Sequence, residues 1–175
     1  MPTYAAFLRG VSPLNAKMSE LKECFESAGF SNVKTILGSG NVIFDTRSTP
    51  RASLERKVEA AMDKSLGRVF ATTIRSLDEL ATLLKSDPFK AFELEPKAKR
   101  VVTLMHAKPR TRVKLPIELD GAHILCVKGT ELFSAYVPSP KGPVFMSLIE
   151  KTFGKDLTTR TWDTIGKVVK AGKPA

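Results

Sequence analysis

Basic or hydroxyl-bearing side chains lie in three short segments of the sequence, two of which also contain glycines, and such residues are typical of sites that bind anions. Arginine and lysine supply charge-assisted hydrogen bonds to a carboxylate or phosphate. A glycine-containing turn presents backbone N–H groups, and a helix N-terminus presents more of them. The candidate ligand-binding residues are Arg9, Gly10, Lys17, Ser39, Gly40, Asn41, Arg160 and Trp162, with Trp162 as a wall of the site. They predict a site for a small anionic or phosphorylated molecule.

The run Gly38-Ser39-Gly40-Asn41 does not have the spacing of a nucleotide-binding loop. Such a loop needs GxxxxGK(S/T) before a helix, whereas a β-branched run follows here. Because glycine at positive φ is what a tight hairpin requires, the sequence favours an antiparallel hairpin. The backbone N–H groups of that turn can still bind an anion.

Both arginine-containing segments also have a structural interpretation. Arg9 follows the first predicted strand, where its guanidinium can bond either loop carbonyl groups or an anion. Residues 158–162, Thr-Thr-Arg-Thr-Trp, can form a helix N-terminus capped by threonine, with Trp162 in the core. Both interpretations stay open from the sequence, and the structural one has the greater weight.

No catalytic residue or metal ligand is predicted. The two histidines, His106 and His123, have no clustered Cys, Asp or Glu at metal-ligand spacing. The sequence lacks a GxSxG nucleophile elbow, and Cys24 has no base partner in its segment. We therefore expect a binding protein without a cofactor rather than an enzyme. An enzyme that acts on a small anionic substrate remains an alternative.

Composition is that of an ordinary soluble globular protein, with 42% hydrophobic and 26% charged residues among 175. No apolar run is long enough to span a membrane, and the N-terminus does not resemble a secretory signal. The two cysteines, Cys24 and Cys126, lie in apolar segments and are expected to be buried free thiols. These features predict a cytoplasmic protein with no membrane partner.

The net charge of +10 is unevenly distributed. Residues 1–95 carry 13 basic and 12 acidic side chains, whereas residues 96–175 carry 15 basic and 6 acidic ones. Such a field favours anionic partners, so sequence-nonspecific nucleic-acid binding through the second half is the main alternative. The basic stretch at residues 97–114 lacks aromatic side chains that would stack on bases. The sequence does not define an oligomeric state.

The first half of the sequence predicts a β-α-β-β-α-β order, which is the ferredoxin-like pattern. The apolar periodicity at residues 18–28 predicts a helix that ends at Gly29. A second helix is expected to begin after Ser53 as N-cap and to end at Gly67. The strands are expected at residues 3–8, 33–37, 42–44 and 69–74, with a further short helix at 77–84.

The second half partly repeats this order. Strands are expected at residues 100–105, 122–127 and 131–137, helices at 144–153 and 161–171, and a polar connection or short helix at 110–117. The prolines and charges of residues 87–95 indicate a connector. We predict an α+β fold of two ferredoxin-like-related modules with mostly antiparallel sheets, at residues 1–86 and 96–175.

Four blocks of the sequence together resemble the bacterial domain of unknown function 1697 family. They are FLRGV at residues 7–11, GF-NVKT at 29–35, GSGNVIF at 38–44 and TTRTWDT at 158–164. The blocks have the order and spacing of the family and extend nearly from end to end of the chain. The resemblance implies an α+β protein with two ferredoxin-like-related modules, and it implies no established activity.

The chain departs from the family pattern at three places. After FLRGV the family typically has an Asn-Val-Gly-Gly turn, whereas this chain has Ser-Pro-Leu-Asn at residues 12–15 and keeps only the lysine and methionine that follow. Gly38 stands where the family usually has glutamine, and Thr161 stands where it has asparagine. If the first loop binds a ligand through its backbone, this chain is expected to bind it differently from its relatives or not at all.

Overall fold

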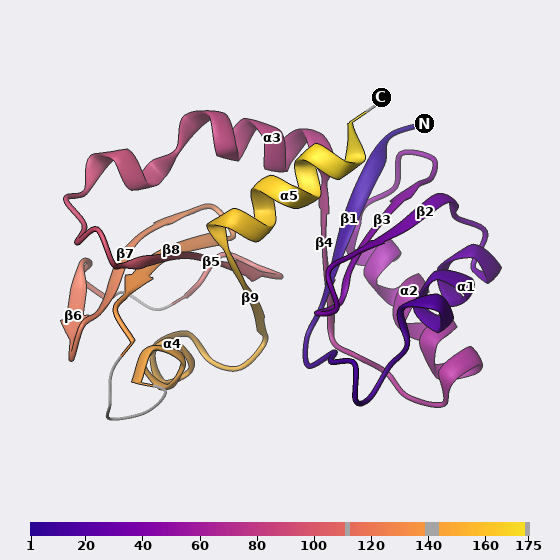
Figure 1. Ribbon diagram of the computed structural model, residues 1–175, viewed down its shortest axis with the longest axis horizontal. Coiled ribbons are helices and arrows are strands. Elements are labelled where there is room, and N and C mark those ends of the chain that lie inside the picture. The colour runs from indigo at the N-terminus through magenta and orange to yellow at the C-terminus, as the bar shows by residue number, and fades with distance from the viewer. Residues whose placement is uncertain (111–112, 139–143, 174–175) are drawn as a thin grey trace. The chain divides into compact units, whose positions relative to one another are not determined.

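Two antiparallel β-sheets form the framework of the computed structural model, which describes residues 1–110, 113–138 and 144–173. The chain divides into two compact units (Figure 1). Unit 1 comprises Met1–Lys85 with Ile165–Ala175, and unit 2 comprises Ser86–Thr164.

The C-terminal helix is therefore grouped differently from the prediction, which placed it in the second module. A Cβ atom added at Gly172 would lie 2.6 Å from Cδ2 of Leu77. The absence of a side chain thus lets the end of this helix approach a residue of unit 1 closely. The predicted connector at 87–95 contains a short 3₁₀ helix, η1 (Pro88–Ala91), and belongs to unit 2.

Unit 1 has the predicted β-α-β-β-α-β order, followed by a helix. Its sheet has the strand order β2-β3-β1-β4, and every neighbouring pair is antiparallel, which is the ferredoxin-like arrangement. The elements are β1 (Thr3–Leu8), α1 (Met18–Ser27), β2 (Ser31–Ile36), β3 (Asn41–Asp45), α2 (Arg51–Leu66), β4 (Thr72–Ser76) and α3 (Leu77–Ser86).

Helices α1 and α2 cover one face of this sheet (Figure 1). Successive strand residues point to opposite faces, so alternate residues of β1, β3 and β4 meet the helices. Phe25 of α1 packs against Phe44 of β3 with ring centroids 5.5 Å apart. The shared core also contains Ala6, Leu8, Leu21, Cys24, Val42, Leu54, Val58, Met62 and Ile74.

Helix α2 begins earlier than predicted, and β4 begins later. Pro50 is the N-cap residue, and its carbonyl accepts hydrogen bonds from the N–H groups of Ser53 and Leu54 at 3.0 and 3.2 Å. Ser53 is therefore a residue of the first helical turn and not the cap. The Glu55 carboxylate is only 6% exposed and accepts the Ile74 N–H at 2.8 Å, which ties α2 to β4.

Unit 2 contains a five-stranded antiparallel sheet with the order β6-β7-β8-β5-β9. Its elements are β5 (Lys99–Met105), β6 (Ile117–Leu119), β7 (Ala122–Lys128), β8 (Glu131–Tyr136), α4 (Val144–Phe153) and β9 (Leu157–Thr161), with α5 (Trp162–Gly172) starting in this unit. Helix α4 packs on one face of the sheet through Phe145 and Ile149 (Figure 1).

Strand β9 corrects the prediction that residues 158–162 form a helix N-terminus. These residues pair with β5, with Val102 opposite Arg160, and α5 begins only at Trp162. The segment predicted as a polar connection or short helix at 110–117 ends in β6, and its residues 111–112 lie outside the described residues.

The second sheet repeats the topology of the first. Strands β9-β5-β8-β7 have the same order and chain sequence as β4-β1-β3-β2, and α4 takes the place of α2. In the place of α1, the described residues between β5 and β7 contain the extra edge strand β6. The fold is thus α+β with two related modules, as predicted.

Candidate functional site

The loop that joins β1 to α1 is closed by one asparagine side chain. The Asn15 side-chain amide donates a hydrogen bond to the Gly10 carbonyl at 2.8 Å, and its oxygen accepts the Ser12 N–H at 2.9 Å. Gly10 has φ +84°, a conformation that favours glycine. Asn15 thus holds a closed loop in a chain that lacks the two glycines expected for the family.

The turn at residues 38–41 packs against this loop. The Leu8 N–H at the end of β1 donates to the Gly40 carbonyl at 2.8 Å. Gly40 has φ +85°, and a Cβ atom there would lie 2.9 Å from Cβ of Val11. The turn connects β2 to β3 as an antiparallel hairpin, which confirms the hairpin prediction.

Asn41 stabilises the same turn from within. Its side chain is 1% exposed, and its amide donates to the Ile36 carbonyl at 2.9 Å and to the Ser39 hydroxyl at 3.1 Å. A buried amide with such partners explains the Ser-Gly-Asn sequence as hairpin chemistry. The turn at residues 38–41 therefore packs against the β1–α1 loop and helps to hold it in place.

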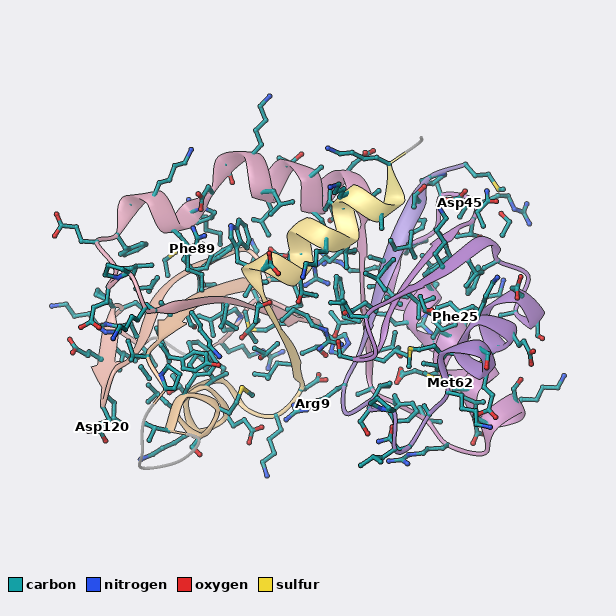
Figure 2. All side chains as sticks on the ribbon, in the orientation of Figure 1. Arg9, Phe25, Asp45, Met62, Phe89 and Asp120 are labelled. Atoms are coloured by element: carbon teal, nitrogen blue, oxygen red, sulfur yellow. The ribbon has the colours of Figure 1, made fainter. Side chains whose placement is uncertain are left out.

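Arg9 and Lys17 supply the positive charge of this region. Arg9 follows the end of β1 (Figure 2). It is half-buried, and its backbone N–H donates to the Ala71 carbonyl at 2.9 Å. Lys17 is exposed and occupies the N-cap position of α1, where no side chain accepts a hydrogen bond from the first turn. The structure thus brings six of the eight predicted residues to one end of the first sheet.

The other two predicted residues, Arg160 and Trp162, belong to unit 2. The Trp162 side chain is 8% exposed, and its ring lies 5.1 Å from that of Phe89 and 6.1 Å from that of Phe133 between centroids. Burial lowers the pKa of Arg160 to about 10, and its Nη1 donates to the Thr159 carbonyl at 2.9 Å. These contacts support the structural interpretation of both residues.

Arg160 has a counterpart in unit 1, which the sequence analysis missed. Arg75 is 1% exposed in β4, the strand that corresponds to β9. Its Nη1 donates to the carbonyl of the preceding residue, Ile74, at 2.9 Å, as Arg160 does to Thr159. Because Ile74 packs beneath α1 and α2, Arg75 points to the opposite face of its sheet.

The hydroxyl of the residue after each arginine caps the N-terminus of the helix that follows. Ser76 accepts the N–H of Glu79 at 3.1 Å, and Thr161 accepts the N–H of Thr164 at 3.2 Å. The shared pattern of an arginine, a capping hydroxyl and an apolar first helical residue could have been found by aligning residues 72–77 with 157–162. In both modules the arginine guanidinium is buried and donates to the carbonyl group of the residue before it.

A histidine–aspartate contact in unit 2 was also not predicted. His106 Nδ1 lies 2.9 Å from Asp156 Oδ1, and the two side chains are 31% and 81% exposed. A carboxylate in this position can orient an imidazole, as in general-base catalysis. Among the described residues, however, no group of three His, Cys, Asp or Glu side chains could hold a metal ion. None of the helices described is long and apolar enough to cross a membrane.

Comparison with known proteins identifies the fold and family. No curated protein matches the chain. The solved structure of the conserved bacterial protein SP0830 from Streptococcus pneumoniae is similar over 99% of both chains, with a TM-score of 0.73 and 19% sequence identity. At that identity the similarity concerns the fold. The family model for the protein of unknown function DUF1697 matches residues 1–133, and the chain therefore belongs to the DUF1697 family.

Proposed function

We propose that this protein binds a small anionic or phosphorylated molecule at the β1–α1 loop of unit 1. The observation that carries the proposal is the position of two cationic residues, Arg9 and Lys17, at the two ends of a loop that Asn15 closes. The turn at Gly40 packs closely against Val11 of this loop.

The chemistry of the loop suits an oxyanion. A guanidinium can donate two parallel hydrogen bonds to a carboxylate or phosphate, and an ammonium acts as a compact point charge. The first N–H groups of a helix have no acceptor within the helix, and no N-cap side chain accepts them in α1. They add partial positive charge beside Lys17. Glu20 in the first turn carries a negative charge that opposes this field.

The nucleic-acid alternative loses part of its support once the units are known. Unit 2 carries 13 basic and 9 acidic residues, a net charge of +4, whereas unit 1 has 15 and 9, a net charge of +6. The acidic residues of 86–95 belong to unit 2, and the basic C-terminal helix belongs mainly to unit 1. The basic excess of unit 2, +4, is thus smaller than the +9 of residues 96–175.

A cytoplasmic location is part of the proposal. Both cysteines are free, with Cys24 buried and Cys126 half-buried. Free thiols are typical of proteins from reducing compartments.

Isothermal titration with inorganic phosphate, pyrophosphate and citrate tests the proposed site. We expect binding by the natural chain and at least a tenfold weaker affinity in Arg9→Ala and Lys17→Ala, because each removes a charge-assisted bond worth about 1.5–3 kcal/mol. Lys22→Ala removes an exposed lysine of the same helix and is the matched control. Unchanged affinity in both site variants, or no binding of any of these anions, would refute the proposal.

A further inference from the structure

A cavity of about 460 Å³ lies in unit 1, lined by α1, the end of α2 and the segment before β4. Its size is in the usual range of small-molecule sites. The lining residues that matter here are Glu20, Glu23, Cys24, Ser65, Arg68 and Phe70. The lining also includes Asn15, which closes the β1–α1 loop of the proposed anion site.

Two carboxylates reach the cavity from one helix. Glu20 and Glu23 are three residues apart on α1, so they lie on the same side of the helix. Both side chains are exposed, and Cys24 between α1 and α2 is 2% exposed. The carboxylates can therefore accept hydrogen bonds from a ligand at little desolvation cost to themselves.

Arg68, in the segment between α2 and β4, adds one cation to the lining of the cavity. Its guanidinium carbon lies 4.8 Å from the centroid of the buried Phe70 ring. The ring covers one face of the guanidinium, which leaves the N–H groups at its edge to bind an acceptor. The hydroxyl of Ser65 adds a further polar group to the lining.

The charges of the lining specify the charges of the ligand. Two carboxylates and one guanidinium give the cavity a net charge of −1 in a protein whose net charge is +10. A complementary ligand has two cationic groups and one carboxylate. This is the charge pattern of a basic α-amino acid, with its α-ammonium group, its charged side chain and its carboxylate.

We propose that this cavity binds a free basic amino acid, with Glu20 and Glu23 binding the two cationic groups and Arg68 the carboxylate. Ligands are thus distinguished by charge: an acidic amino acid would place like charges opposite the two glutamates. The cavity adjoins the β1–α1 loop, because Asn15 belongs to its lining, but its ligand has the opposite net charge from that of the proposed anion site.

Isothermal titration of the full chain with L-arginine and L-lysine tests the assignment. We expect binding of both, at least tenfold weaker binding in Glu20→Gln and Glu23→Gln, and no binding of L-glutamate. Glu26→Gln on the same helix is the matched control, because Glu26 does not line the cavity. Arg68→Gln should weaken L-arginine at least tenfold but leave agmatine, which lacks the carboxylate, nearly unchanged.

The two cysteines give a second readout in the natural chain. Cys24 lines the cavity, whereas Cys126 lies in unit 2. Saturating L-arginine should slow alkylation of Cys24 by iodoacetamide at least threefold and leave Cys126 unchanged, as followed by peptide mass spectrometry. The proposal would be overturned if neither basic amino acid bound, or if the Glu20→Gln and Glu23→Gln variants bound as tightly as the natural chain. It would also be overturned if L-arginine did not slow the alkylation of Cys24.

Discussion

Replacing Ser134 by alanine is expected to stabilise unit 2. Ser134 is fully buried in the middle of β8, opposite Val101 of β5 and Ile124 of β7. Among the described residues, its hydroxyl is the buried side-chain polar atom for which no hydrogen-bond partner is found. Burying a hydroxyl without a partner costs about 1–3 kcal/mol.

The size of the effect follows from two opposing contributions. Ser134→Ala removes the desolvation cost of the hydroxyl and leaves a void smaller than a methyl group, which costs up to about 1 kcal/mol. The free energy of unfolding should therefore rise by about 1.5 kcal/mol, within a range of roughly 0–3 kcal/mol. In thermal unfolding, each kcal/mol would shift the midpoint temperature by about 4–8 °C for a unit of this size.

Tryptophan fluorescence during urea denaturation is the suitable assay. Trp162 is the single tryptophan of the chain and packs against Phe89 and Phe133 of unit 2, so its signal follows this unit. Ser147→Ala changes an exposed serine of α4 and should alter the midpoint far less. A loss of 1 kcal/mol or more in Ser134→Ala would show that the hydroxyl has a stabilising partner and refute the reasoning.

Three further predictions concern the backbone, a cap and the thiols. Gly40→Ala should cost about 1–3 kcal/mol of unfolding free energy in urea denaturation, because φ is +85° and the added Cβ meets Val11. Gly166→Ala, with open space in α5, should gain about 0.5–1 kcal/mol in the same assay. Thr161→Ala should destabilise the start of α5 by about 1 kcal/mol in urea denaturation, and rescue by Thr161→Ser would separate capping from packing. Burial raises the pKa of both Cys24 and Cys126, so at pH 8 iodoacetamide should modify them more slowly than a free thiol, with rates that increase as pH rises. Rates equal to that of free cysteine at pH 8 would contradict the last expectation.

The sequence predicted the elements of unit 1 because local signals there agree with one another. The periodicity of α1, the glycines at the hairpin and the β-branched strands all indicate the same order. The start of α2 was misplaced, because a serine is a common N-cap and Pro50 is not. Element boundaries depend on such single contacts.

Strand β9 could not be predicted from its own residues. The run Thr-Thr-Arg-Thr has β-branched residues that suit a strand and hydroxyls that suit a helix cap. Thr161 does cap α5, so the capping interpretation was correct for one residue and wrong for the segment. Pairing with β5, more than 50 residues away, decided the outcome.

The sequence alone determined the α+β class, the ferredoxin-like order of the first module, the hairpin at residues 38–41 and the family resemblance. These properties depend on local periodicity and turn chemistry, which residues close together in the sequence determine. Only the tertiary structure decided which candidate residues converge, that the Arg75 and Arg160 guanidinium groups are buried, and that Glu20, Glu23 and Arg68 line one cavity. These depend on contacts between residues far apart in the chain, which strand pairing and helix packing bring together.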